Sequence, residues 1–394
     1  TNNFLSGVYI TDNINGAAFL DVSTGEFYVA QGNKTYIDKL LQTFKPSEVI
    51  IQKVKQNIFT DIYGDHFYLS TFDDWVFTHE FSKELLLKQF GTTSLKGFGI
   101  EEMHAGIIAA GAVLHYLAET QHDKISHITK ISRIEEEHYV WLDKFTIRNL
   151  ELVNPINEQG VTLLHVIDKT ITPMGSRMLR RWILMPLKNT KPIEERQQIV
   201  EWFINNQDIA ENIRQQIKLI GDLERLISKA AMGKINPREI LQIRKALLSI
   251  ENIKIICKNI NIEPFDKIAE QLNPCNLISE RIGKEINQDT PAVINKGNII
   301  ANGVSKELDE LRELAYSGKD YLIQMQQREA EKTGIPSLKI GYNNIFGYYL
   351  EVTNTHKDKV PPEWIRKQTL VNCERYVTEE LKQYEEKILG AEEK

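Results

Sequence analysis

The residues best suited to chemistry lie in one short segment near the end of the chain. Between Lys332 and Tyr376 there are seven Lys or Arg and four Asp or Glu, a net charge of +3 in a chain whose net charge is −6. Amide and hydroxyl side chains lie among the cations, at Asn354, Gln368, Thr369 and Asn372. Such a mixture of donors suits phosphate oxygens rather than one deep site. The alternative is an ordinary solvated β-surface, because short charge excesses are common.

Two helical segments flank this basic segment and must position it. Apolar residues before it recur at alternating steps of four and three, which is the spacing of a coiled-coil seam. They are Val304, Leu308, Leu311, Ala315, Gly318, Leu322 and Met325. The spacing predicts a helix over 299–333, ended by Gly334, since glycine tolerates the left-handed cap conformation.

A returning helix is predicted after the basic segment, with Thr378 as its N-cap and two glutamates in its first turn. It resumes the same stripe at Val377, Leu381, Tyr384 and Ile388. Only 17 residues remain from Thr378 to Lys394, so half of the seam has no partner. This mismatch, with a start that lacks Met, leads us to interpret the chain as a fragment of a longer protein.

Alternating apolar and polar residues predict antiparallel strands between the two helices. One face would carry Leu338, Ile340, Tyr342, Phe346, Tyr348, Leu350 and Val352, and the other Lys339, Tyr349, Glu351 and Thr353. Asn343-Asn344 falls where the first two strands must be connected. The sequence therefore predicts a small β-domain at the tip of a helical arm.

The first 55 residues are predicted to form an α/β domain. Strands are expected at 7–10, 16–22 and 26–30, followed by a helix over 35–44 and a strand over 49–52. This order resembles the ribonuclease H-like topology, whose two-metal nucleases need several converging carboxylates. Asp12 could supply the first, but 49–52 offers no acid. A metal-dependent nuclease is therefore the less favoured hypothesis, and Asp12 and Asp21 are more simply turn residues.

Helical patterns dominate the chain from residue 101 to residue 333. A helix over 101–120 would place Met103, Ile107, Leu114 and Leu117 on one face. Another would begin at 190–192, with Ile193, Val200 and Ile204 facing inward. The sequence Asn236-Pro237-Arg238-Glu239 predicts a helix start with an N-cap, a first-position proline and a capping-box acid. Long helices with short joints indicate a rigid scaffold.

Other chemistries find no support in the sequence. The nine histidines form no metal-ligand spacing, the three cysteines are widely separated, and no phosphate-binding loop motif occurs. We therefore expect no catalytic residue, metal or cofactor in the chain. With 394 residues, 42% of them hydrophobic, two or three domains are expected. The longest apolar run, 105–114, is too short to cross a bilayer, and a reducing cytoplasm suits the cysteines.

Several motifs resemble one family. The run from Thr172 to Trp182, with Pro186-Leu187 and 195–197, closely resembles the core signature of the MutS family of DNA mismatch-recognition proteins, as does Asp222-Leu223-Glu224-Arg225. Segments 338–343, 347–349 and 368–376 resemble the clamp of that family, and 19–27 is similar to the start of its connector. The resemblance covers nearly the whole chain in family order.

The resemblance implies a multidomain α+β fragment. Residues 1–125 would be a ribonuclease H-like α/β connector, and 126–319 a mostly α-helical core with the outgoing coiled-coil lever. Residues 320–378 would be a small antiparallel β clamp inserted at the lever tip, and 379–394 a truncated returning lever helix. The mismatch-reading and ATPase domains of the family would lie outside this chain.

The implied function is DNA mismatch recognition in mismatch repair. The clamp would touch the sugar-phosphate backbone of double-stranded DNA without reading bases, and the connector would contact a MutL-type repair partner. By resemblance the full-length protein is a homodimeric ATPase that uses ATP and Mg²⁺ in the bacterial cytoplasm, at the nucleoid, with no membrane contact. The alternative from another class is a coiled-coil scaffold or interaction module that binds no DNA.

Two sets of residues follow from this interpretation. The expected DNA contacts are Lys339, Asn343, Asn344, Lys357, Arg366, Lys367, Gln368, Thr369, Asn372 and Arg375. The expected lever packing residues are Val304, Leu308, Leu311, Ala315, Leu322, Met325, Leu381, Tyr384 and Ile388.

Overall fold

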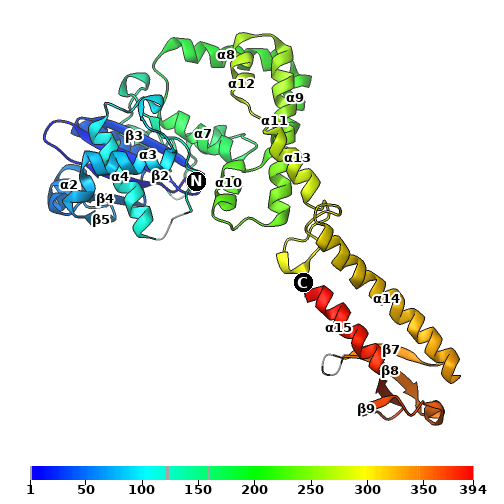
Figure 1. The fold of residues 1–394 in the computed structure, drawn as a ribbon. Helices are drawn as coiled ribbons and strands as arrows, with labels where there is room; N and C mark the ends of the chain where they lie inside the picture. Colours follow the sequence, from blue (N-terminus) through cyan, green and yellow to red (C-terminus); the bar gives the residue numbers. More distant parts are fainter. Residues whose placement is uncertain (1, 121–123, 158, 344, 346, 394) are drawn as a thin grey trace. The chain divides into compact units, whose positions relative to one another are not determined.

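The chain forms two compact units, Thr1–Ile299 and Ile300–Lys394, in a computed structural model (Figure 1). The structure describes residues 2–120, 124–157, 159–343, 345 and 347–393. Within these ranges the side chains of 296, 314–319, 388, 389, 392 and 393 are not described.

A six-stranded sheet organises the first part of unit 1. Strands β1 (Leu5–Tyr9), β2 (Asn15–Asp21) and β3 (Glu26–Gly32) are antiparallel neighbours. Helix α1 (Lys34–Phe44) leads to β4 (Glu48–Gln52), parallel to β1, and then come β5 (Leu69–Phe72), parallel to β4, and β6 (Ser132–Arg133), parallel to β3. The order is β5-β4-β1-β2-β3-β6. The predicted succession of three hairpin-linked strands, a helix and a fourth strand is confirmed.

Both faces of this sheet are covered by helices (Figure 1). Helices α3 (His79–Phe90) and α4 (His104–Glu119) pack on one face, and α1 and α2 (Gln56–Tyr63) on the other. The backbone of α4 comes so close to the strands that a Cβ atom built on Gly16 would lie 1.9 Å from the carbonyl oxygen of Ala105. Glycine is therefore required at Gly16 for this approach.

Helix α4 begins at His104, three residues later than the sequence predicted, and it is buried on nearly all sides rather than on one face. Its apolar run, 105–114, lies in the core between the sheet and α3. Within the part of the chain that the structure describes, no helix is both long enough and apolar enough to cross a membrane.

Short and long helices make up the rest of unit 1. In order they are α5 (Lys144–Asn149), α6 (Leu163–Ile167), α7 (Pro173–Leu184), α8 (Thr190–Asn205), α9 (Gln207–Ile220), α10 (Leu223–Ala231), α11 (Pro237–Ile260), α12 (Glu263–Gln271) and α13 (Asn276–Glu285). The predicted capping box of α11 is confirmed, because the Asn236 side chain accepts from the Glu239 amide at 3.0 Å and the Glu239 carboxylate accepts from the Asn236 amide at 3.0 Å.

The inward face predicted for α8 is wrong for two of its three residues, whereas Ile193 is half-buried. Val200 and Ile204 are 58% and 64% exposed. The side packed against the core instead carries the half-buried Trp202 and Phe203, whose rings lie 5.0 and 5.4 Å from that of Phe265 on α12. Helix α8 has an aliphatic and an aromatic stripe. The aromatic stripe packs against the core because its larger side chains can bury more area and make edge-to-face contacts.

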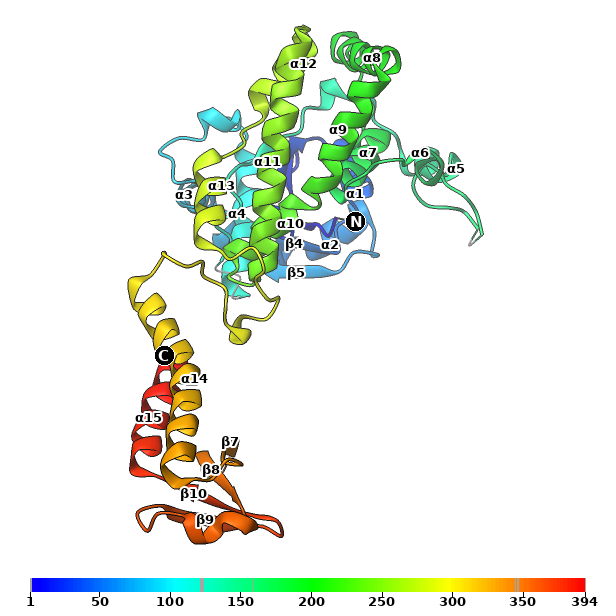
Figure 2. The ribbon, with the colours of Figure 1, turned by 90° about the vertical axis from the view of Figure 1, so that its right-hand side faces the viewer.

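The described part of unit 2 contains two α-helices, a four-stranded sheet and a short 3-10 helix (Figure 2). Helix α14 (Lys306–Thr333) is followed by β7 (Lys339–Asn343), β8 (Gly347–Thr353), β9 (Ile365–Thr369) and β10 (Cys373–Val377), and α15 (Glu379–Glu393) follows. The strands are antiparallel, in the order β7-β8-β10-β9. The small antiparallel sheet between two helices agrees with the alternation in the sequence.

Helix α14 begins at Lys306 rather than at residue 299, because the Ser305 hydroxyl accepts from the amide of Leu308 and caps the helix there. Val304 therefore precedes the helix and is 38% exposed, so its predicted role in the seam is wrong. The far end agrees with the sequence, since Gly334 has a φ of 65° as the left-handed C-cap. Thr378 caps α15 by accepting from the Leu381 amide at 3.1 Å.

The seam between α14 and α15 is packed in its half nearest the sheet. Leu322, Met325 and Leu381 are buried in one cluster with strand residues of β8 and β10, and Tyr384 stacks on Tyr321 at 3.9 Å between ring centroids. Leu308 and Leu311 are half-buried and lie outside this cluster. The side chains of Ala315 and Ile388 lie outside the described residues.

Candidate nucleic-acid interface

The sheet of unit 2 has one apolar face and one polar face. Leu350, Val352 and Tyr376 lie on the face that packs against the two helices. Because paired residues of antiparallel strands point the same way, the strand register places four polar residues side by side on the opposite face. From β7 to β9 these are Lys339, Glu351, Arg375 and Gln368.

Arg375 is held at the centre of this polar row. Its Nε donates to Glu351 at 3.1 Å and its Nη1 donates to the Gln368 side-chain oxygen at 2.9 Å. The guanidinium lies over the Tyr349 ring, 4.4 Å from the centroid. Tyr349 is consequently buried although it lies on the polar face. Arg375 is thus positioned by three neighbours, and Glu351 offsets part of its charge.

Arg366 is also paired. Its guanidinium lies 3.2 Å from the Glu374 carboxylate, which accepts a further hydrogen bond from the Tyr376 hydroxyl. The hydrogen bond from Tyr376, with the charges of Arg366 and Lys357, lowers the pKa of Glu374. Glu374 therefore stays charged and offsets Arg366 over the physiological pH range.

An irregularity in the strand pairing separates Lys367 from these pairs. Gln368 lies opposite Arg375 and Arg366 opposite Tyr376, so Lys367 is the extra residue of a bulge on the edge strand β9. A bulge re-aims the side chains around it. The spacing of residues in the sequence gives no sign of this shift.

Three of the predicted cations form no ion pair in the described part of the chain, although Lys357 acts on Glu374 and Lys367 lines a cavity with Glu379, Glu385 and Glu386. Lys339 on β7, Lys357 in the 3-10 helix η6 (Asn354–Lys359) and Lys367 on β9 are exposed, and none has an ion-pair partner among the residues that the structure describes. Lys359, by contrast, donates to the carbonyl oxygen of Gly334 at 3.0 Å and caps the end of α14. The sheet therefore presents positive charge at both edge strands and at η6.

The uncharged polar residues predicted to contact DNA also fall into two groups, those that are exposed and those whose side chains already have a partner. Thr369 and Asn372 are exposed at the turn between β9 and β10, whereas the Asn343 side chain accepts from the Ile345 amide at 2.8 Å and supports the turn after β7. Gln368 is occupied by Arg375. Asn344 lies outside the described residues.

Sequence reasoning missed the residues that organise the site. The alternation places Tyr349 and Glu351 on the polar face, but the strand register is needed to show that they hold Arg375 and that Glu374 lies near Arg366. Sequence reasoning also missed two apolar side chains at the loop tips, Ile345 and Val371, which are 90% and 92% exposed.

The structure offers no support for the nuclease hypothesis. Asp12 is exposed in the turn after β1, and Asp21 accepts from the backbone amides of Asn3 and Ser23. Across the described residues, no three His, Cys, Asp or Glu side chains are grouped closely enough to hold a metal ion. A two-metal reaction needs such a group.

Comparison with known proteins gives a consistent result over the whole chain. Residues 3–129 match the family model of MutS domain II, and residues 145–389 match that of MutS domain III. The chain is 58% identical over 393 residues to the DNA mismatch repair protein MutS of Parabacteroides distasonis, 57% to that of Phocaeicola vulgatus and 54% to that of Cytophaga hutchinsonii. Each match covers all of this chain and 45–46% of the relative, so the chain spans less than half the length of these relatives.

Proposed function

The chain belongs to the MutS family, and from this premise we propose that it takes part in DNA mismatch repair by contacting the sugar-phosphate backbone of duplex DNA through the sheet of unit 2. The contact would be independent of base sequence, since lysine and amide donors recognise phosphate and sugar rather than base edges. We keep the division into a connector over 1–125, a core and outgoing lever over 126–319, a clamp over 320–378 and a returning lever over 379–394 as part of this proposal.

The observation that carries the proposal is the set of three exposed lysines without ion-pair partners among the described residues, Lys339, Lys357 and Lys367. Phosphate contacts by such cations release counterions from the duplex, and this release supplies nearly all of non-specific affinity. The paired Arg366 and Arg375 would contribute less, because Glu374 and Glu351 already offset their charge.

The two helices would couple this contact to the rest of the protein. Arg328 on α14 donates to Glu380 on α15 at 2.7 Å, and the Tyr321 hydroxyl binds the same carboxylate. Lys359 fixes the sheet region to the end of α14 through Gly334. A sheet tied to both helices in this way would pass a displacement at the DNA along α14 and α15.

Other parts of the proposal rest on the family alone. The full-length protein would be a homodimer in the cytoplasm, at the nucleoid, with ATP and Mg²⁺ bound by a domain outside this chain. A MutL-type partner would bind the connector. A coiled-coil scaffold without DNA contact remains the competing function, and the following experiment separates the two.

Fluorescence anisotropy of a labelled homoduplex, titrated with this chain between about 20 and 200 mM salt, tests the DNA contact. We expect weak, sequence-independent binding that falls with salt and is weakened, but not abolished, when Arg366 and Lys367 are both changed to Glu, because Lys339 and Lys357 remain. The matched control changes Lys218 and Lys245 to Glu, two exposed lysines of α9 and α11 in unit 1. Unchanged affinity in the Arg366/Lys367 variant would contradict the proposal, and no salt-sensitive binding at all would favour the scaffold.

A further inference from the structure

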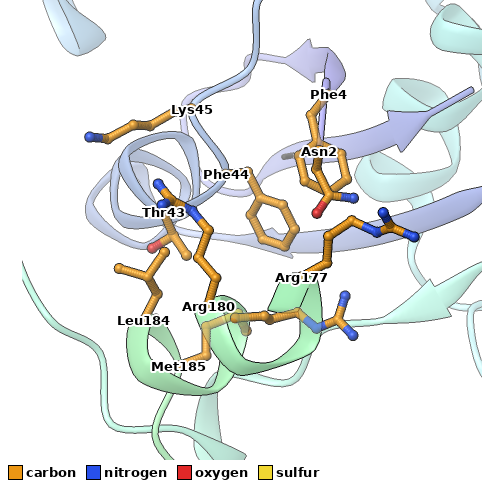
Figure 3. A pocket seen from close by; sticks show the side chains of 10 residues that line it. Asn2, Phe4, Thr43, Phe44, Lys45, Arg177, Arg180, Leu184 and Met185 are labelled. Carbon is orange, nitrogen blue, oxygen red and sulfur yellow. The ribbon is translucent and has the colours of Figure 1, made fainter. Parts of the chain in front are cut away.

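A small cavity lies between the end of α1 and helix α7 in unit 1. Its volume is about 130 Å³, and its lining includes Thr43, Phe44, Arg180 and Leu184 (Figure 3). Arg180 extends from α7 towards Thr43 at the end of α1 (Figure 3). Lys45, the residue after α1, lines this cavity and also a second one of about 230 Å³.

The second cavity adds two more cations. Lys144 and Arg148 of α5 line it together with Lys45 and Asn154. Four positive side chains, Arg180, Lys45, Lys144 and Arg148, therefore surround two neighbouring cavities. Ligand pockets for drug-sized molecules measure about 300–1,000 Å³, so each of these cavities suits a single tetrahedral anion rather than a whole nucleotide.

The charges on the cavity walls are unevenly compensated. Arg177 forms two hydrogen bonds with Asp222, at 2.7 and 3.0 Å, and a third with Glu224, and Arg181 pairs with Glu26. Among the described residues, the four cations Arg180, Lys45, Lys144 and Arg148 have no ion-pair partner. The two kinds of arginine lie within one turn of α7, so the difference is local.

The surroundings of Arg180 and Lys45 lower the pKa of both side chains. Burial lowers the pKa of Arg180, and burial together with the charges of Arg180 and Lys144 lowers the pKa of Lys45. Like charges thus lie near one another around cavities whose cations are half-buried at Arg180 and exposed at Lys45, Lys144 and Arg148, an arrangement that a bound counter-charge would stabilise.

A structural role at the end of α1 is the competing explanation. Lys45 is the left-handed C-cap of α1, and in one orientation of its amide the Asn154 side chain accepts from Lys45 Nζ at 2.7 Å. A helix C-terminus carries about half a negative charge, and an amide carries none. These dipoles offset at most part of the charge on four cations.

We propose that Arg180 and Lys45, with Lys144 and Arg148 at the rim, bind a phosphate group. The planar guanidinium of Arg180 matches two phosphate oxygens, and the ammonium of Lys45 adds a point charge. The source is either free phosphate or a phosphate of nucleic acid. This site is separate from the sheet of unit 2 and stands without the proposed function.

Calorimetric titration of this chain with inorganic phosphate, at constant ionic strength set with chloride, tests the site. We expect saturable binding that weakens about tenfold in Arg180→Gln and in Lys45→Gln, since each removes a charge-assisted contact. Arg180→Lys should give an intermediate affinity, because it keeps the charge and loses the fork. Lys218→Gln is the matched control and should bind phosphate as the parent chain does. Lys45 is exposed, so its variant should remain folded if Arg180→Gln does not.

A separate experiment tests whether the bound phosphate belongs to nucleic acid. In a chain whose Lys339, Lys357 and Lys367 are all changed to Gln, residual duplex affinity that falls with Arg180→Gln would assign the phosphate to DNA. Binding of inorganic phosphate that depends on Arg180 and Lys45 would assign it to a free anion. If neither titration depends on these residues, and the variants only lower the urea midpoint, the cations merely cap α1 and the proposal is wrong.

Discussion

The difference between paired and unpaired cations on the sheet of unit 2 predicts how DNA affinity depends on salt. The perturbation is the change of Lys339, Lys357 and Lys367 to Gln, singly and together. Each phosphate that a cation contacts contributes about −0.9 to the slope of log affinity against log salt. Three contacts give a slope of about −2.7, so affinity should fall about fortyfold between about 50 and 200 mM salt.

Removal of one lysine should reduce this dependence by a predictable amount. With two contacts left the slope becomes about −1.8, and the same change in salt lowers affinity only about twelvefold. The triple variant should lose most of the dependence. Arg366→Gln should change the slope less than Lys367→Gln, because Glu374 lies 3.2 Å from the Arg366 guanidinium and already offsets its charge.

Anisotropy titrations of one homoduplex at several salt concentrations measure these slopes directly. Lysine-to-arginine variants at the same three positions are the controls and should keep the parent slope, since they keep the charge. Two results would refute the reasoning. One is an equal loss of slope in Arg366→Gln and Lys367→Gln, and the other is a triple variant that retains the parent slope.

Further predictions concern stability. Arg177→Met should destabilise unit 1 by about 3–5 kcal/mol in urea denaturation, because it leaves the carboxylates of α10 and its N-cap without their buried partner. Burial alone would raise the pKa of Asp222, but the hydrogen bonds and charge of Arg177 lower it. The contribution of Asp222 to the free energy of unfolding should therefore be present above the ordinary aspartate pKa of about 3.9 and be lost as pH falls through the lower pKa of the folded state. The urea midpoint of unfolding, measured over a series of acid pH values, checks this. Leu322→Asp should unfold unit 2, whereas Leu308→Asp should cost about 1 kcal/mol or less, and equal thermal midpoints would contradict the packing observed between α14 and α15.

The sequence predicted those features whose causes are local. The capping box at Asn236, the glycine cap at Gly334 and the threonine cap at Thr378 each depend on residues within one turn, and all three are present. The alternation predicted for the strands after Gly334 also agrees with β7 and β8. Local hydrogen bonds and backbone preferences favour these caps whatever the tertiary contacts are.

Errors arose where two local solutions were possible. Helix α8 carries an aliphatic stripe and an aromatic pair, and only the presence of Phe265 on α12 decides which faces the core. The apolar spacing continues through Val304 and so predicts too early a start for α14, which Ser305 caps. The spacing of apolar residues does not show where a packing partner lies or whether a nearby capping residue will start the helix at another position.

For the candidate site, the sequence identified residue types and not their pairing. Arg366, Lys367 and Arg375 look equivalent in the sequence, yet the register of β8, β9 and β10 gives two of them an acid and leaves one on a bulge. Cross-strand pairing joins residues that are far apart in the chain, so one shift of register would exchange the partners.

This pairing also explains how one small sheet can combine rigidity with a non-specific contact. On the polar face, Arg375 donates to Glu351 and lies over the ring of Tyr349. These contacts support the sheet without a ligand. Lys359 and Glu380 tie the surrounding chain to α14 and bridge the two helices. On the proposed function, the three lysines that have no ion pair within the described residues would follow phosphates of any sequence with flexible side chains. On the proposed function, DNA affinity would therefore depend on lysine charges that could be removed without loosening the sheet. Removal of Glu351 would release Arg375, and removal of Glu374 would release Arg366. Either change would strengthen non-specific DNA binding and weaken the support of the sheet.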